Sequence, residues 1–530
     1  MKLSRREFLA ISASALAACK PNTVAPRKFT GKLLGPSASV GHLLREAISA
    51  TPKFTERKRI VIVGGGIAGL SAARRLQQRG CDNFILLELE NSVGGNSRYD
   101  ETAVSAAPWG AHYVPLPSPE CQPVLDLFKD LGIITGADSE GRAIFNEFYL
   151  CAEPMERLFI NGAWQEGLLP MTGISREDKR QYDAFTALMD EYRNARGSDG
   201  KRAFVIPVDE SSRDPKFTAL DQQTMTEFMD AHGWNSKPLR WYVDYCCRDD
   251  FGAHANQISA WAGVHYFASR GGTASNANSQ TVVTWPEGNG WLVRQLQKPL
   301  TARIRRNSLA YRITQRGGPV LVDAIDSQTR APFRIECDQV IFCAPRFVAH
   351  HVLEELQNQP CPTRHYAPWI VANITLTQKP TGHGAELAWD NVFYDSASLG
   401  YVVATHQNPS RRVGKTVITY YYALCEKSPT EARQEAQLRT YDQWCNLILS
   451  DLERVHRNIR AQIENLDVWL WGHGMIAPTP NFIWGEARRS MQSNLGRVHF
   501  AHSDMSGISL FEEAYIRGQR AADEALNQMT

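Results

Sequence analysis

A short apolar run followed by three spaced glycines constrains this chain more than any other feature of its sequence. Residues 60–63 read Ile-Val-Ile-Val, and the glycines stand at Gly64, Gly66 and Gly69. Consecutive β-branched residues are typical of a strand that is buried on both faces. In a strand–turn–helix unit, Gly64 permits a tight turn, Gly66 lets a pyrophosphate approach the backbone, and Gly69 lets the helix pack close to the sheet.

The residues after these glycines complete the pattern. Residues 70–76 continue with helical spacing, and the N-terminus of such a helix offers unpaired N–H groups to phosphates. A second apolar run, residues 84–87, leads to Glu88, whose carboxylate can accept hydrogen bonds from a ribose hydroxyl. The order strand, helix, strand and acid therefore predicts dinucleotide binding. The alternative interpretation is a glycine-rich turn in an α/β core.

The segments beyond Glu88 distinguish a flavin dinucleotide from a nicotinamide one. Gly94 and Gly95 are paired, and residues 109–113 read Trp-Gly-Ala-His-Tyr. A nicotinamide dehydrogenase does not need a glycine pair just after the ribose acid. Both segments resemble the corresponding segments of the FAD-dependent amine oxidase superfamily. This superfamily includes monoamine and polyamine oxidases, protoporphyrinogen oxidases and phytoene desaturases.

Three later segments are similar to the same superfamily. Residues 338–345 resemble its strand that returns to the dinucleotide domain and ends in Ala-Pro. Residues 498–504, which end in Asp504, and residues 511–522 resemble the strand and terminal helix that complete the FAD site. A helix N-terminus under the flavin stabilises negative charge on the reduced ring. Taken singly, these segments are an ordinary strand and an amphipathic helix, but their order and position favour FAD.

The resemblance spans roughly residues 55–525. It implies FAD as the cofactor and hydride transfer from a substrate C–H bond to flavin N5. Asn96 stands where the family usually has arginine, so Arg98 is a candidate for that phosphate contact. The resemblance implies the following FAD-binding residues: Gly64, Gly66, Ala68, Gly69, Glu88, Gly94, Gly95, Asn96, Arg98, Trp109, Gly110, Ala111, His112, Asp504 and Ala514.

These motifs occur at both ends and in the middle of the chain. We therefore expect an α/β fold whose Rossmann-like FAD-binding domain is assembled from residues 55–118, 280–347 and 485–528. Residues 119–279 and 348–484 then form a substrate domain with a mixed sheet and helices covering one face. The substrate pocket is expected between that sheet and the flavin.

The two intervening segments carry different patterns. Residues 175–189 have helical spacing, whereas residues 369–376 and 416–423 are rich in β-branched and aromatic residues. The first segment is therefore expected to be helical in its middle and the second to supply strands.

The N-terminal residues resemble an export signal. Arg5 and Arg6 are followed by Phe-Leu and a short apolar stretch, as in a twin-arginine signal, and Leu-Ala-Ala then precedes Cys19, as in a bacterial lipobox. The expectation is export by the twin-arginine pathway and lipidation at Cys19, which anchors the protein to the bacterial membrane facing the periplasm. Residues 1–19 are then the signal and residues 20–54 a tether. A fortuitous basic, Ala-rich tail is the alternative.

Composition excludes some classes of protein. A length of 530 residues suffices for two subdomains, and the net charge of +2 arises from interspersed acids and bases. Such a charge pattern lacks the clustered basic residues typical of nucleic-acid-binding proteins. The 11 cysteines follow no zinc or disulfide spacing, and His350-His351 lacks partners with metal-ligand spacing, so no metal is predicted. Most cysteines are expected to be small buried residues.

One segment is unusually rich in acids and aromatic residues. Asp249 and Asp250 are candidates to hold a cationic amine, while Trp261, His265 and Tyr266 are candidates to shape a slot. Adjacent residues in a regular element point in different directions, so at most one of the two acids is expected to face the pocket unless the backbone turns nearby. The alternative is a helix end with Asp caps and a buried aromatic stripe.

Other positions depart from or extend the family pattern. Many amine oxidases place a lysine near flavin N5, and the matching position here is Ala372. Leu510 replaces the usual aromatic residue before the terminal helix. His473 is a candidate proton-transfer group, with a structural histidine as the alternative.

Three functional interpretations follow. The first is an FAD-dependent amine oxidase or dehydrogenase, with polyamines favoured because paired carboxylates suit a polycation, and with O2 or an unknown carrier as the electron acceptor. The second is a flavin desaturase or oxidase of an apolar or cyclic substrate, which the missing lysine favours. The third is a non-catalytic flavin-fold protein with a binding or assembly role.

Overall fold

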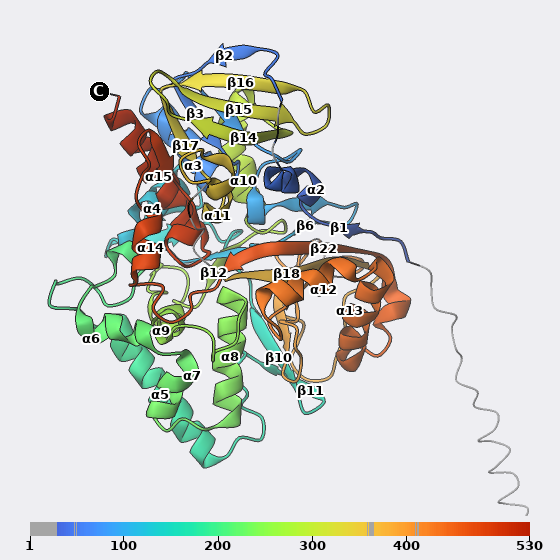
Figure 1. Ribbon diagram of the computed structural model, residues 1–530. Coiled ribbons are helices and arrows are strands. Elements are labelled where there is room, and N and C mark those ends of the chain that lie inside the picture. Colours follow the sequence, from blue (N-terminus) through green and yellow to red (C-terminus); the bar gives the residue numbers. More distant parts are fainter. Residues whose placement is uncertain are drawn as a thin grey trace, which may run out of the picture.

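A parallel sheet and a larger mixed sheet organise the molecule (Figure 1). The computed structural model describes residues 29–46, 48, 50–357, 359, 365–408, 410 and 413–529. Figure 1 shows the parallel sheet and its helices in the upper part of the view, the mixed sheet across the middle, and a group of helices below it.

The parallel sheet has five strands in the order β13-β4-β3-β17-β23. The strands of this sheet pair in parallel, as expected for strands joined by crossover helices. Each strand falls in one of the three segments expected to build the FAD domain. The strands are β3 (Ile60–Val63), β4 (Phe84–Leu87), β13 (Ile304–Arg305), β17 (Gln339–Phe342) and β23 (Val498–Phe500).

Two helices from opposite ends of the chain lie side by side on one face of this sheet. They are α3 (Ile67–Gln78) and α15 (Phe511–Asn527). A Cβ on Gly518 would lie 2.1 Å from the Ala68 carbonyl oxygen, so glycine is what lets the helices approach so closely. The Ser71 hydroxyl donates to the Tyr515 carbonyl across this contact at 2.6 Å. The C-terminal segment is thereby fixed against the first helix of the nucleotide-binding unit.

The other face of the parallel sheet is covered by a four-stranded sheet and a helix. The sheet has the order β14-β15-β16-β2, and buried aliphatic side chains from both sheets form one core. These elements are β2 (Thr55–Arg57), β14 (Ser308–Thr314), β15 (Val320–Asp326), β16 (Pro332–Cys337) and α11 (Arg346–Val352).

The mixed sheet has eight strands in the order β1-β22-β18-β21-β20-β19-β10-β11. Its β1/β22 and β10/β19 pairs are parallel and the others antiparallel. The strands are β1 (Leu33–Leu34), β10 (Glu156–Ile160), β11 (Ala163–Glu166), β18 (Tyr366–Leu376), β19 (Asp390–Phe393), β20 (Tyr401–Val403), β21 (Thr416–Ala423) and β22 (Ile463–Ile476). The expected β-rich runs are thus the central strands β18 and β21.

Helices α12 (Pro429–Leu438) and α13 (Tyr441–Val455) cover one face of the mixed sheet, as expected. Buried residues such as Trp444 and Leu449 join them to the strands. The opposite face carries a second apolar cluster rich in tryptophan and tyrosine. That aromatic face is the one directed toward the FAD domain.

The helical group comes from the first intervening segment, as its spacing predicts. Helix α5 (Arg176–Asn194) begins with a capping box, in which Ser175 accepts the Asp178 N–H and the Asp178 carboxylate accepts the Ser175 N–H. It packs with α6 (Pro215–Thr218), α7 (Met225–Ala231), α8 (Lys237–Phe251) and α9 (Ala260–Ala268) around one core.

Shorter elements connect these parts. They are α2 (Ala38–Gly41), β5 (Tyr99–Glu101), β6 (Ala106–Pro108), β7 (Tyr113–Pro115), α4 (Gln122–Asp130), β8 (Ile134–Ala137), β9 (Ala143–Phe145), β12 (Val282–Thr284), α10 (Gly290–Gln297) and α14 (Glu486–Met491).

Part of the range expected to be a tether contacts the folded body. Leu33 and Leu34 pair with Val468 and Trp469 of β22. The next residues form α2 and a 3₁₀ turn against the parallel-sheet unit, so residues 33–45 contribute to the fold. Cys19 and the twin-arginine segment lie outside the described residues.

Within the described part of the chain, nine cysteines are buried, as expected, and all nine are free thiols. Over the same residues, no helix combines the length and apolar character needed to cross a membrane.

Candidate active site

A cavity of about 570 Å³ opens at the carboxyl ends of β3 and β4. The turn between β3 and α3 forms part of its wall. Gly64 has a φ of 104°, which side-chain-bearing residues rarely adopt, and a Cβ on Gly69 would lie 1.9 Å from the Gly64 carbonyl oxygen. Gly69 does not line the cavity; it lets α3 start directly behind the turn. The start of α3, with its backbone N–H groups, therefore forms part of the cavity wall.

Glu88 lies at the end of β4 and lines the same cavity. Its carboxylate accepts the Gly65 N–H at 2.7 Å and the Glu90 N–H at 2.9 Å. Burial raises the pKa of Glu88 to about 7, and these two N–H donors oppose the rise. The backbone bonds fix the carboxylate where a ribose hydroxyl could reach it.

The second glycine loop faces the first. Gly94 and Gly95 have φ values of 128° and 55°, and a Cβ on Gly95 would lie 3.4 Å from the Gly66 Cα. The loops therefore leave a narrow backbone-lined passage without side chains. Such a passage accommodates a pyrophosphate close to backbone N–H groups.

The C-terminal segment supplies the opposite wall. Asp504 Oδ2 accepts the Arg346 N–H and the Tyr366 hydroxyl, both at 2.7 Å. Burial alone raises the pKa of Asp504, but His502 and these two donors outweigh it and hold the pKa below its usual value. Asp504 is therefore an ionised acceptor in the cavity wall, and Ala514 in the first turns of α15 lines the same space.

This cavity fits FAD. It combines two side-chain-free glycine loops, an acid fixed at the end of the second strand, an ionised acid in the C-terminal segment and the N-termini of two helices. Predicted FAD residues that line it are Gly64, Gly66, Ala68, Glu88, Gly94, Gly95, Asn96, Ala111, Asp504 and Ala514.

The other five predicted FAD residues do not line this cavity: Gly69 packs behind the first glycine turn, Gly110 and His112 line a neighbouring cavity, and Arg98 and Trp109 lie elsewhere. Arg98 pairs with Glu90 at 3.2 Å and stacks 5.0 Å over the Trp469 ring, outside the cavity wall. Trp109 is buried in the aromatic cluster, where its indole N–H donates to Asp100 at 2.8 Å. Both side chains stabilise the wall between the two domains.

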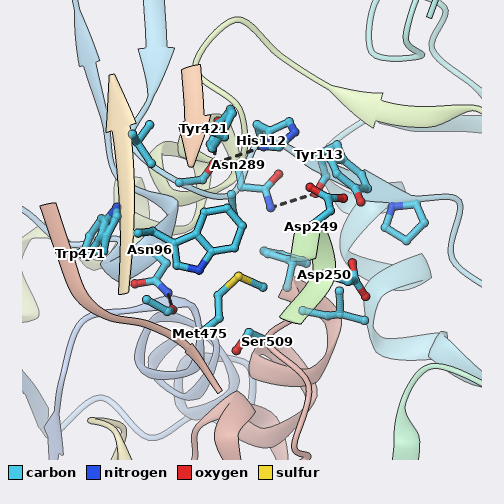
Figure 2. Close-up of a pocket in the computed structure, with 18 of the residues that line it drawn as sticks. Asn96, His112, Tyr113, Asp249, Asp250, Asn289, Tyr421, Trp471, Met475 and Ser509 are labelled. Carbon is cyan, nitrogen blue, oxygen red and sulfur yellow. Dashed lines mark hydrogen bonds between the residues drawn. The ribbon is translucent and has the colours of Figure 1, made fainter. Parts of the chain in front are cut away.

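A second, smaller cavity of about 140 Å³ adjoins the first (Figure 2). The two share a wall made of Asn96, Ala111, Gly474, Ser509, Leu510 and Phe511. The Asn96 side-chain amide donates to the Gly474 carbonyl, so this residue spans the junction between the cavities. A molecule in the smaller cavity would therefore lie directly beside one in the larger.

Aromatic side chains form much of the smaller cavity. Trp369, Tyr421 and Trp471 come from the mixed sheet, while His112 comes from the loop after β6 and Tyr113 begins β7. Figure 2 shows His112, Tyr113 and Tyr421 close together at one end and Trp471 at one side. These rings make an apolar slot for an aliphatic chain or ring.

His112 is neutral in this slot. Burial lowers the pKa of His112 to about 4, and its ring centroid lies 4.7 Å from that of Tyr421. Nδ1 lies 3.3 Å from the Gly110 carbonyl, which can only accept. Nε2 is therefore the ring nitrogen left to accept a proton or hydrogen bond.

Both adjacent acids of α8 line this cavity, contrary to the expectation that at most one would face it. They occupy the last turn of a regular helix, and the left-handed turn at Gly252 comes only after them. Residues one apart on a helix differ by about 100°, so a broad pocket at the helix end can contact both. Figure 2 shows Asp249 and Asp250 on the same side of the cavity.

The two acids differ in their partners. Asp250 forms an ion pair with Arg270 at 3.0 Å, and Arg270 also donates to the Tyr113 hydroxyl at 3.1 Å. Asp249 has no ion pair with any described residue. Burial, with the neighbouring charge of Asp250, raises the pKa of Asp249 to about 7.

Glu512 is a third acid in the wall and was not among the predicted site residues. It is 1% exposed, and neither carboxylate oxygen has a hydrogen-bond partner among the described residues. Burial raises the pKa of Glu512 to about 8. The sequence signal is the adjacent acid pair Glu512 and Glu513 at the start of the terminal helix, and the Glu513 carboxylate accepts the Val208 N–H.

His473 lines the larger cavity, apart from Asp249 and Asp250. Burial lowers the pKa of His473 to about 4, and the nearby cations Arg433 and Arg45 lower it further, so the ring is neutral near pH 7. The structure therefore places this candidate beside the cofactor space and outside the smaller cavity.

The predicted aromatic slot of α9 is wrong. Trp261 and His265 are fully buried in the helical core, where their rings stack and His265 Nε2 donates to the Val205 carbonyl at 2.9 Å. Tyr266 packs 4.1 Å from the Arg270 guanidinium and does not line the cavity. Helix α9 is apolar around its whole circumference, which is typical of a buried helix.

The position matched to the family's lysine also lies outside the cavity. Ala372 faces the core under α12 and α13, whereas Trp369 and Val371 on the other face of β18 line the cavity. No lysine of the described chain lines either cavity.

Comparisons with known proteins agree with this arrangement. A family model described as flavin-containing amine oxidoreductase matches residues 67–526. Amine oxidase [flavin-containing] B of Bos taurus is 23% identical over 496 residues, which cover 89% of this chain and 86% of the relative. A triple mutant of a putrescine oxidase has the same fold, with a TM-score of 0.66 and 16% identity over 90% of this chain and 100% of the other.

Cyclohexylamine oxidase from Brevibacterium oxydans also shares the fold, with a TM-score of 0.62 and 14% identity over 89% of this chain and 99% of the other. The family match begins at residue 67, directly after the first glycine loop, and covers the second glycine loop and the C-terminal wall of the cavity that fits FAD. The chain is thus an FAD-dependent oxidoreductase that belongs to the flavin-containing amine oxidoreductase family.

Proposed function

We propose that the enzyme oxidises a diamine or polyamine whose reacting carbon is held at the junction of the two cavities. The observation that carries this proposal is the placement of Asp249, Asp250 and Glu512 among aromatic rings beside the FAD cavity. Aromatic faces accept the methylene chain and attract cations, and carboxylates accept ammonium hydrogens. The shared fold with a putrescine oxidase is consistent with such a substrate.

FAD, when bound, supplies the acceptor for the hydride that leaves the substrate carbon. The chain's own residues position that carbon and control protons. Trp369, Tyr421 and Trp471 exclude water from the slot. The reacting amine must be neutral to release hydride readily, and Nε2 of His112 is a neutral acceptor in the slot. Asp249 is the acid available to a distal ammonium, because Asp250 is already paired with Arg270.

Anaerobic mixing of the purified, FAD-loaded enzyme with candidate substrates tests the proposal. Putrescine or spermidine should bleach the flavin absorbance, and an alkane of equal length should not. Bleaching by apolar compounds but by no diamine or polyamine would overturn it.

A second candidate is oxidation or desaturation of an apolar or cyclic substrate. It is favoured by the aromatic slot and by the lack of a lysine at the cavities over the described residues. The same anaerobic screen with cyclic and unsaturated hydrocarbons decides between the two. Bound FAD that no compound of either class reduces would instead favour a binding role.

The proposed setting is the bacterial periplasm. The twin-arginine pattern at Arg5 and Arg6 and the lipobox ending in Cys19 support export followed by lipid anchoring. O2 or a carrier at the membrane surface is then the proposed electron acceptor.

A further inference from the structure

Three potential metal ligands converge on the mixed-sheet side of α8. They are His254, Cys425 and Glu426, whose ligand atoms all lie within 4.8 Å of one another. His254 Nε2 lies 3.5 Å from Cys425 Sγ. None of these residues lines either cavity of the active site.

The His254 ring is oriented from behind by an acid. Nδ1 lies 3.1 Å from both carboxylate oxygens of Asp244. Asp244 is itself fixed, because Oδ1 accepts the Ala255 N–H at 2.9 Å and Oδ2 pairs with Arg248 at 3.1 Å. A carboxylate on one ring nitrogen leaves the other free as a ligand and increases its basicity, as in carboxylate–histidine–zinc triads.

We propose that His254, Cys425 and Glu426 bind one zinc ion, with water completing a four-coordinate site. Thiolate, imidazole and carboxylate are the ligand set that zinc accepts. Zinc–sulfur and zinc–nitrogen bonds of about 2.3 and 2.0–2.1 Å at a tetrahedral angle place the two ligand atoms about 3.5 Å apart. The observed separation of Nε2 and Sγ therefore matches two ligands of one ion.

The site joins the two walls of the substrate cavity. His254 lies just beyond the end of α8, four positions after the pocket acid Asp250. Cys425 lies just beyond the end of β21, four positions after the pocket residue Tyr421. A zinc ion at this point cross-links the helix that bears the pocket acids to the strand that bears a pocket aromatic ring. Such a cross-link would stabilise and position these walls whichever substrate the flavin oxidises.

The test uses the FAD-loaded protein after chelation and re-equilibration with Zn2+ or Co2+ alone. Wild-type protein should bind one equivalent of zinc by elemental analysis and melt at a higher temperature with zinc than after chelation. Cobalt should give thiolate–cobalt ligand-field bands at wavelengths longer than the flavin absorbs.

Four variants locate the site. Cys425→Ser and His254→Gln should lose the stoichiometric metal, and Asp244→Asn should weaken zinc affinity about 10- to 100-fold. Glu426 is exposed, so Glu426→Gln should fold normally and bind zinc more weakly. The matched control is Cys445→Ser, because Cys445 is also buried but lies on α13; it should keep full binding.

Zinc should also protect the Cys425 thiol from alkylation. A wild-type protein that binds no more zinc than Cys425→Ser, or a Cys425 that is alkylated equally fast with and without zinc, would overturn the proposal and leave a metal-free thiol–imidazole pair. Flavin content and anaerobic bleaching are measured on the same samples, so a failure here is distinguishable from a failure of the proposed oxidation.

Discussion

Asp250 Oδ1 lies 3.0 Å from Nη2 of Arg270, whereas Asp249, its neighbour on the same helical turn, has no ion-pair partner among the described residues. Burial of both acids beside one cation leaves one of the two, Asp249, unmatched at the wall of the cavity. This asymmetry assigns different roles to two residues that look equivalent in the sequence.

Asp249→Asn should therefore raise the Michaelis constant for a diamine or polyamine. One charge-assisted contact is worth roughly 1.5–3 kcal/mol, or about a ten- to hundredfold change. The constant for an uncharged substrate should change much less. Steady-state kinetics on both substrate types measure the effect, with the surface substitution Asp126→Asn as control. Equal constants for wild type and variant would assign Asp249 to structure alone.

Asp250→Asn should act mainly on stability. The change leaves the largely buried Arg270 guanidinium without its carboxylate, and breaking a buried ion pair costs up to about 3–5 kcal/mol. Urea unfolding followed by tryptophan fluorescence measures this loss. If unfolding is unchanged while amine affinity falls, the roles of the two acids are reversed.

Stability of the FAD-loaded enzyme should fall as pH rises from about 4.5 toward 8, in part because of Glu512. Its pKa is raised to about 8 by burial, so between these limits the folded state binds a proton that the unfolded state has released. Over this pH range, one such group lowers the free energy of unfolding by on the order of 2–5 kcal/mol.

Glu512→Gln removes this titration and keeps the side-chain shape. Urea unfolding at several pH values should show a flatter decline for the variant than for wild type. Parallel curves would mean that Glu512 is already ionised in the folded protein and that a partner neutralises it.

The FAD half of the site could be predicted from the sequence because its determinants are local. Backbone conformation requires Gly64 and Gly94, and Glu88 directly follows a strand, so each leaves a signature within a few neighbouring residues. The eight-stranded sheet was predicted as a mixed sheet fed by β-rich runs, but its strand order was not, because that order depends on pairings between distant segments such as β1 and β22.

The substrate pocket was harder to predict because its walls meet only in three dimensions. Whether a residue of β18 faces the cavity depends on strand register, and register placed Ala372 on the opposite face. In the sequence, Glu512 has the pattern of an ordinary acid in the first turn of a helix, and only its burial in the structure distinguishes it. His254 and Cys425 are 171 positions apart, so no spacing rule detects them.

Glu88→Ala should weaken FAD retention. The carboxylate is the acceptor fixed at the end of β4, and a hydrogen bond to a charged group is worth about 1.5–3 kcal/mol, or roughly ten- to a hundredfold in the dissociation constant. Equilibrium dialysis of FAD measures it. Glu101→Ala, an exposed acid outside the cavity, is the control and should bind FAD like wild type. Full occupancy in Glu88→Ala would argue against ribose binding at this acid.

Cys19→Ser should release the protein from the membrane fraction or block its processing. Replacing Arg5 and Arg6 with Lys should retain it in the cytoplasm, because twin-arginine transport requires the arginine pair. Fractionation of the native host, with mass spectrometry of the N-terminus, measures both. An unmodified Met1 N-terminus in wild-type protein would remove the basis for both expectations.

Gly69→Ala should disrupt the nucleotide site without touching the cofactor. The added Cβ would lie 1.9 Å from the Gly64 carbonyl oxygen, and neither backbone segment can yield without moving α3 away from β3. Overpacking of this kind costs about 1–3 kcal/mol, and the shifted helix N-terminus would no longer face the phosphates. FAD content and thermal unfolding should therefore both fall. Gly136→Ala, whose Cβ would meet only the Ile144 side chain at 4.0 Å, is the matched control and should leave both unchanged. If Gly69→Ala retained full FAD and wild-type stability, close packing at this glycine would not be what positions α3 for the dinucleotide.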